Sequence, residues 1–146
     1  MTSETRYYED VDVGDDIGPI ERAIDHGQVV EFVKAWTNDT KPTRFNDPET
    51  AANEGLAGPI VPGVMTMAFI SRLLTEWAPG VSLNTLDVVF RQLVLHDVVH
   101  TLSGIVTDKG MIEGRSEVQC DVFLADPEGT RLIIGKAILE LPSREG

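Results

Sequence analysis

The middle of the chain carries its strongest helical pattern. Between Gly63 and Trp77, apolar residues recur every three or four positions and also fill most of the places between them. A helix on a protein surface has one apolar stripe, whereas a helix that is apolar on several sides is buried. We therefore predict a buried central helix over residues 63–77, ended by Ala78-Pro79-Gly80.

A second helix is predicted nearer the N-terminus. Asp25 can cap its first turn, and Gln28, three residues later, completes a capping-box pattern. Apolar residues then follow at helical spacing as far as Trp36, which predicts a helix over residues 26–37. The chain before this helix is predicted to be an irregular arm followed by a short strand over residues 20–24.

Between these two helices the pattern predicts a short helix flanked by loops. Asp47 and Pro48 have the N-cap and first-turn pattern of a helix start, and Gly55 is suited to end that helix. Residues 37–46 contain a proline and many small polar side chains, and residues 56–62 are rich in glycine and proline. Both stretches are therefore predicted to be loops.

Beyond Ser82 the pattern changes from a helical to a strand period. The β-branched runs that follow are residues 86–95, 98–107, 114–124 and 131–141. Turn-forming residues at 108–110 and 126–129 separate successive runs. We predict an antiparallel meander wrapped around the central helix, which makes the whole chain, residues 1–146, one α+β domain.

The composition limits the kinds of molecule that the chain is expected to bind. The 24 acidic residues against 12 basic ones give a net charge of −12, which disfavours nucleic acid. The single Cys120 allows no internal disulfide and is expected to be a small core residue, and no metal-site spacing is found. Without a signal peptide or a membrane-spanning run, the chain is expected to be soluble and cytoplasmic. The predicted sheet has an edge to cover, so we also expect a dimer.

Two residues are candidates for a catalytic role. Asp39 follows the end of the 26–37 helix, where the negative end of the helix dipole disfavours a carboxylate and favours its use as a base. Gly63 places a backbone N–H at the start of the central helix, where it can hold a developing oxyanion. Each residue has a structural alternative, because Asp39 can cap a loop and Gly63 can serve a turn.

Taken together with the opening residues 9–15 and the stretch Phe90 to Asp97, these features make the chain resemble the MaoC-like acyl dehydratases. This is the family of the R-specific enoyl-CoA hydratases. The resemblance covers nearly the whole chain and implies a single hotdog fold. It also implies that water is added to, or removed from, the double bond of a trans-2-enoyl thioester.

The resemblance also assigns roles to single residues. Asp39 matches the catalytic aspartate of the family, and Pro42 matches the proline of the same motif. Gly63 matches the glycine that binds the thioester oxygen, with Val64 beside it at the substrate. Ser71 matches a polar position on the central helix.

Several positions depart from the family pattern. Arg44 stands where the family has its catalytic histidine, or Phe45 does if the one-residue insertion before Pro48 lies earlier. Lys41 replaces the asparagine of the motif, and Pro62 replaces the histidine before the oxyanion glycine. Arginine stays protonated and cannot shuttle a proton, so Arg44 would instead orient water or bind an anionic part of the substrate.

The three histidines are candidates to replace the missing one. His26 lies at a predicted helix start, whereas His96 and His100 lie at a strand turn and in the strand after it. The alternative for each is a surface or structural role.

Three functions remain open. The first is a lyase that hydrates or dehydrates an acyl thioester such as acyl-CoA, using Asp39, Arg44 and the Gly63 N–H. The second is a catalytically degenerate accessory subunit that pairs with a related hotdog chain. The third is a hotdog thioesterase, which is disfavoured because the only acid on the central helix, Glu76, lies near its exposed end. The basic residues available for CoA are Lys41, Arg44, Arg91, Lys109 and Arg115; no metal or redox cofactor is expected.

Overall fold

The helices begin where their capping residues predict. In the computed structural model, which describes residues 4–145, the Asp25 side chain accepts the Gln28 N–H at 2.7 Å and the Gln28 side chain accepts the Asp25 N–H at 3.1 Å. Helix α1 accordingly runs His26–Thr37, which confirms the predicted bounds. Asp47 caps α2 (Pro48–Asn53) through a similar side-chain bond. Local hydrogen bonds therefore set both helix starts.

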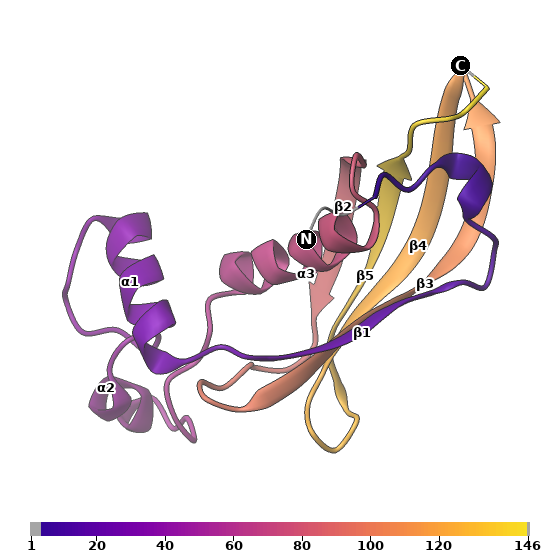
Figure 1. Cartoon of the computed structure of the whole chain (residues 1–146). Coiled ribbons are helices and arrows are strands. Elements are labelled where there is room, and N and C mark those ends of the chain that lie inside the picture. The colour runs from indigo at the N-terminus through magenta and orange to yellow at the C-terminus, as the bar shows by residue number, and fades with distance from the viewer. Residues whose placement is uncertain (1–3, 146) are drawn as a thin grey trace.

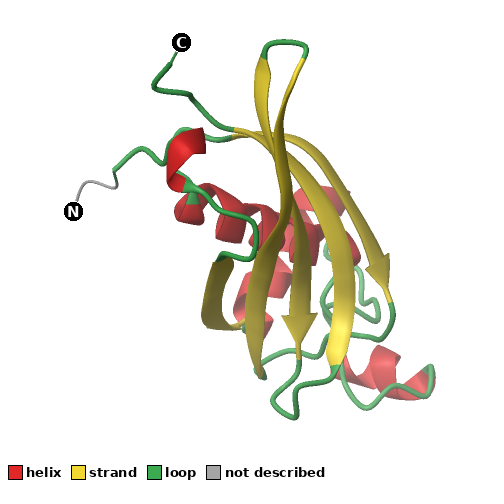
Figure 2. Cartoon of the chain, turned by 90° about the vertical axis from the view of Figure 1, so that its right-hand side faces the viewer, coloured by secondary structure: helices red, strands yellow, loops and turns green. Residues whose placement is uncertain are grey.

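The strands form one antiparallel sheet in the order β1-β3-β4-β5-β2 (Figures 1 and 2), which confirms the α+β class. A short 3-10 helix, η1 (Tyr8–Asp10), precedes strands β1 (Asp16–Ala23), β2 (Ser82–Phe90), β3 (Val99–Ile112), β4 (Arg115–Ala125) and β5 (Arg131–Glu140). The predicted meander of four successive strands is wrong for β2, which pairs with β5 and not with β3. The reason is that β2 ends at Phe90. The backbone N–H groups of Arg91 and Gln92 both donate to the carbonyl of Leu132, and residues 91–98 connect β2 to β3 instead of extending the strand.

The predicted turn at residues 108–110 is also wrong. These residues lie within β3 and pair with β4, next to a register shift between Val106 and Asp108. The chain reverses instead at Glu113 and Gly114, whose φ angles are 53° and 80°. A two-residue hairpin turn requires positive φ at both central residues, so the reversal falls where the backbone can adopt it. The turn-like residues at 108–110 mark an irregularity in the strand.

Helix α3 (Gly63–Trp77) has the predicted bounds and packs against β1, β2, β3 and β4. Figure 2 shows the helices on one side of the sheet. The side chains of α3 that are buried are Met65, Thr66, Ile70, Leu73 and Leu74. Val64, on the side of α3 away from these residues, is 47% exposed, so the prediction that α3 is buried on several sides is wrong for that side. That face is polar toward the end of the helix, at Arg72, Thr75 and Glu76.

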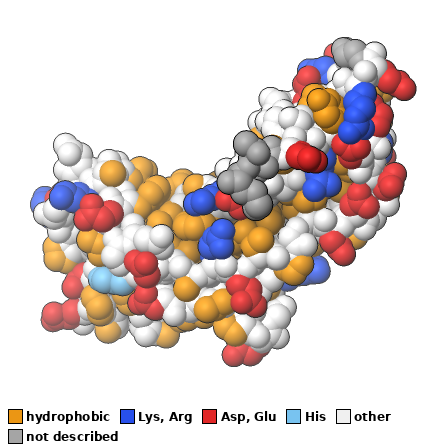
Figure 3. Space-filling model, viewed as in Figure 1, with side chains coloured by type: hydrophobic (Ala, Val, Ile, Leu, Met, Phe, Trp, Pro, Cys, Tyr) orange, Lys and Arg blue, Asp and Glu red, His pale blue; other side chains and the backbone are white. Residues whose placement is uncertain are grey.

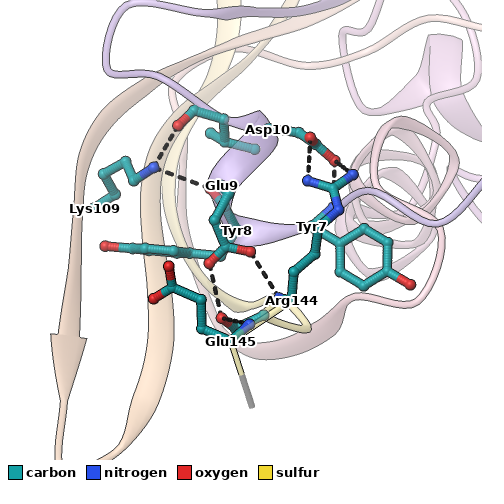
Figure 4. A network of polar contacts seen from close by, with 9 residues as sticks. Tyr7, Tyr8, Glu9, Asp10, Lys109, Arg144 and Glu145 are labelled. Atoms are coloured by element: carbon teal, nitrogen blue, oxygen red, sulfur yellow. Dashed lines mark hydrogen bonds and ion pairs between the residues drawn. The ribbon is translucent and has the colours of Figure 1, made fainter.

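The short helix η1 lies between the C-terminal residues and strand β3 (Figure 4). Arg144 donates to both carboxylate oxygens of Asp10, at 2.7 and 3.1 Å. The Lys109 ammonium donates to the backbone carbonyls of Tyr8 and Val11, at 3.0 and 2.6 Å. These contacts hold η1 against β3. Within residues 4–145 no helix is long and apolar enough to cross a bilayer.

Candidate functional site

Asp39 lies on an exposed turn just after α1. The C-cap of this helix is Asn38, whose left-handed backbone (φ 53°, ψ 37°) turns the chain away from the helix axis. Asp39 Oδ1 accepts the backbone N–H of Lys41 at 3.0 Å, so this carboxylate does cap its own loop. Its other oxygen has no hydrogen-bond partner among residues 4–145. Asp39 lines a cavity of about 190 Å³ beside Lys34, Pro42 and other residues of this loop.

Arg44 faces a different acid. Its guanidinium lies 3.3 Å from the Glu54 carboxylate and 5.9 Å from the centre of the Phe45 ring. The backbone carbonyl of Arg44 accepts the N–H of Ile60, which ties this loop to the segment that leads into α3. Within residues 4–145 the ion pair of Arg44 is therefore with Glu54, and none joins it to Asp39.

The start of α3 offers free backbone donors. Its N-cap, Pro62, makes no side-chain cap, and the N–H groups of Gly63 and Val64 have no hydrogen-bond partner within the described chain. These donors lie at the positive end of the helix dipole, so the site can hold a negative oxygen. The ring of Phe90 packs on Gly63 so closely that a Cβ there would lie 2.9 Å from it.

The remaining polar residues of α3 are engaged within the helix or beside it. The Ser71 hydroxyl donates to the carbonyl of Ala68 at 3.2 Å, a bond within its own helix. The Glu76 carboxylate pairs with Arg72 at 2.7 Å and lies 3.9 Å from Arg22. Ser71 is therefore available to a ligand only as a hydrogen-bond acceptor, and the charge of Glu76 is neutralised by its neighbours.

The basic residues considered for CoA do not gather in one place. Lys109 and Arg115 lie near the closed end of the β3–β4 hairpin, which Figure 1 shows far from α2, and Arg115 pairs with Glu117 at 3.4 Å. Lys41 and Arg91 are exposed. On the face shown in Figure 3, Lys and Arg side chains are scattered among acidic ones. Of the five basic residues considered for CoA, this leaves Lys41 and Arg44 in the loop that follows Asp39, and Arg91 just after β2.

The structure brings together two histidines that are 70 positions apart in sequence. His26 and His96 approach to 3.0 Å between their Nδ1 atoms, beside a cavity of about 310 Å³. Burial lowers the pKa of His96 from its ordinary value, because the charged ring is poorly solvated there. Sequence spacing carries no signal for this pair, because it depends on how residues 91–98 cross the molecule.

The third candidate histidine, His100, and the single cysteine are core residues. His100 is almost fully buried, its pKa is lowered by burial, and its Nδ1 has no hydrogen-bond partner among residues 4–145. Cys120 is buried in β4, and burial raises the pKa of its thiol to about 12. The expectation that Cys120 is a small core residue is confirmed.

No protein-family model matches the chain, and no curated protein matches it. Solved structures do. The (R)-hydratase from A. caviae involved in PHA biosynthesis is 22% identical, with a TM-score of 0.78 over 90% of this chain and 98% of that one. The MaoC-like dehydratase from Rhodospirillum rubrum is 18% identical, with a TM-score of 0.77 over 95% and 98%. The ChsH1–ChsH2 complex from Mycobacterium tuberculosis contains a chain that is 18% identical, with a TM-score of 0.74 over 88% and 97%. The chain therefore has the hotdog fold of R-hydratases and MaoC-like dehydratases, as expected.

Proposed function

We propose that this chain is a cytoplasmic MaoC-like lyase that adds water to an enoyl-CoA or a similar enoyl thioester, or removes it. The observation that carries the proposal is the pair of free N–H groups at the start of α3, on Gly63 and Val64, in a fold shared with hydratases. Such donors stabilise the negative charge that develops on a thioester oxygen.

In this proposal Asp39 is the acid–base group. Its carboxylate takes a proton from water while the water oxygen bonds to the β-carbon of the enoyl group. The electron pair of the double bond moves toward the thioester oxygen, where the Gly63 N–H stabilises it. The α-carbon then takes the proton that Asp39 accepted from the water, which restores the carboxylate, and the reverse sequence removes water. Arg44 cannot accept a proton, so it would leave Glu54 to bind an anionic part of the substrate.

The site would be completed by a second chain. Gly63 does not line the cavity that Asp39 lines. The acyl group would run from this cavity along Val64 and Ser71, and a homodimer or a heterodimer with a related chain would cover it. The ChsH1–ChsH2 assembly is a complex of two different chains, one of which has this fold.

An accessory subunit is the second candidate function. It is favoured by the engagement of both loop residues: the guanidinium of Arg44 is held by Glu54, and the carboxylate of Asp39 caps its own turn. In that case a partner chain would supply the catalytic histidine. A thioesterase is the third candidate, and it is weakened because Glu76 is paired with Arg72.

The test is hydration of a panel of trans-2-enoyl-CoA substrates, followed by loss of the conjugated thioester absorbance. Wild type, Asp39→Ala, Arg44→His and Glu31→Ala, an exposed acid on α1, are compared. The lyase proposal expects activity that falls by at least about 100-fold in Asp39→Ala and is unchanged in Glu31→Ala.

Other outcomes identify the alternatives. A silent wild type that gains activity in Arg44→His, or on addition of a related hotdog chain, supports the accessory subunit and overturns the lyase. Release of free CoA, detected with a thiol reagent, supports the thioesterase.

A further inference from the structure

Two histidine rings meet between the start of α1 and the segment that follows β2. Nδ1 of His26 lies 3.0 Å from Nδ1 of His96, and the ring centroids are 5.1 Å apart. On its other side, Nε2 of His96 lies 3.0 Å from the carbonyl oxygen of Ile60. The backbone N–H of His26 donates to the Asp97 carboxylate at 3.0 Å. The pair is therefore held by contacts from three separate segments.

These contacts determine which nitrogen carries each proton. A carbonyl oxygen only accepts, so Nε2 of His96 carries the hydrogen that it donates to Ile60. Burial of His96 keeps this ring neutral, so its Nδ1 holds a lone pair. Nδ1 of His26 is then the donor between the two rings. A neutral His26 is left with its own lone pair on Nε2.

That nitrogen belongs to a residue that lines a cavity of about 310 Å³. Nε2 of His26 has no hydrogen-bond partner within residues 4–145, and it is not among their buried unpartnered atoms. It is therefore accessible to a ligand. His96 and Asp97 also line the cavity, and the rest of its wall is small or apolar: Pro48, Ala57, Gly58, Pro59, Leu95 and Val98. A cavity of this size, with an apolar wall and few polar groups, suits a small organic molecule.

The charges near the cavity disfavour an anion. The carboxylate of Asp97 lines it beside His26. Asp47 directly precedes Pro48, which lines the same cavity, so a second acidic residue adjoins its wall. A neutral ligand avoids repulsion from both acids.

We propose that this cavity binds a small neutral molecule that has an apolar body and a hydroxyl group, with the hydroxyl donating to Nε2 of His26. His96 is the positioning residue, because it holds His26 in the tautomer that leaves this lone pair free. Neither Asp39 nor Gly63 lines the cavity. The proposal is therefore independent of the hydratase function, and each can fail without the other.

The first test is the tautomer of His26, read from the ring nitrogens by nitrogen-15 NMR on the full chain. Wild type is expected to carry the proton on Nδ1. His96→Phe should return His26 to the Nε2–H form that a free histidine prefers. His96→Gln can donate to Ile60 and accept from His26, so it should restore the wild-type form, and His100→Gln should not change it. An Nε2–H tautomer in wild type would overturn the proposal.

The second test compares two matched probes, phenol and anisole, in which a methyl replaces the hydroxyl hydrogen. Both are titrated while the ring signals of His26 are followed. Phenol is expected to bind wild type about tenfold more tightly than anisole, the effect of one hydrogen bond. His26→Phe should bind the two probes equally. Equal binding by wild type, or no binding of phenol, contradicts hydroxyl recognition.

Discussion

Gly63 is constrained by a neighbouring ring as well as by its own N–H. A Cβ at this position would lie 2.9 Å from two atoms of the Phe90 ring. Gly63→Ala keeps the N–H but forces the ring to move, so we expect a loss of about 1 kcal/mol in the free energy of unfolding. The ring is half exposed and can turn away, which limits the cost.

Urea unfolding of a double-mutant cycle checks this. Because Phe90→Ala removes the ring, Gly63→Ala should cost much less in that background than in wild type. Additive effects of the two substitutions would show that the ring does not constrain Gly63.

Buried histidines predict a loss of stability in mild acid. The pKa of both His96 and His100 is lowered from 6.5, chiefly by burial. In the unfolded chain these rings take up protons as the pH falls below 6.5, whereas in the folded chain they stay neutral, so the unfolded state is favoured. The free energy of unfolding should therefore fall between pH 7.5 and pH 5.5.

His100→Leu should make this decrease smaller, because one of the two buried rings is gone. Urea unfolding at both pH values measures it. The carboxylates with lowered pKa, Glu9, Asp10 and Asp47, have ordinary values of 4.5 or less. Their contribution to the free energy of unfolding is lost only below this pH range, so they do not affect the comparison between pH 7.5 and pH 5.5. An unchanged pH dependence in His100→Leu would contradict the account.

At the scale of elements, the β3–β4 turn places an unfavourable residue at a left-handed position. Glu113 has φ 53°, a conformation that asparagine adopts more readily than glutamate. Its contact with Arg115 is long, at 3.9 Å, and highly exposed, so little is lost with it. Glu113→Asn should therefore raise the free energy of unfolding by about 0.5 kcal/mol. Glu128→Asn, at a turn residue whose own φ is not positive, is the matched control. Equal effects at both positions would argue against this explanation.

The elements that sequence analysis placed correctly are those determined locally. The start of α1 follows from the bonds between Asp25 and Gln28, three residues apart, and both helix bounds were predicted. The pairing of β2 with β5 depends on contacts across about fifty residues, such as Val88 with Gly135. Strand period carries no information on which strands are neighbours, so the order of the sheet could not be predicted from it.

The same distinction applies to the candidate site of the whole molecule. The environments of Asp39 and Gly63 were predictable, because each follows from the end or the start of one helix. The ion pair of Arg44 with Glu54 and the contact of His26 with His96 were not, since they depend on how loops from separate segments meet. The family resemblance led to the correct fold, but it could not show where these side chains turn.

The two edges of the sheet differ in their ability to pair with another chain. The β1 edge carries Pro19 and a register shift between Ile17 and Ile20, and both features hinder the addition of a strand. At the other edge, Val89 and Phe90 of β2 are 57% and 51% exposed.

This difference predicts that a second copy, or a related chain, pairs along β2. The apolar surface continues from the β2 edge to Val64 and Leu93, which are 47% and 54% exposed.

Sedimentation of wild type and variants tests this prediction. Wild type should sediment as a dimer. Val89→Lys combined with Leu93→Lys should give a monomer, because lysine at Val89 opposes pairing on the edge strand and lysine at Leu93 places a charge in the apolar surface that follows β2. Val13→Lys, at an equally exposed residue of the N-terminal arm, should stay dimeric. If the partner covers the acyl site, the monomeric variant also loses hydratase activity. A dimer that survives both lysines would place the interface elsewhere.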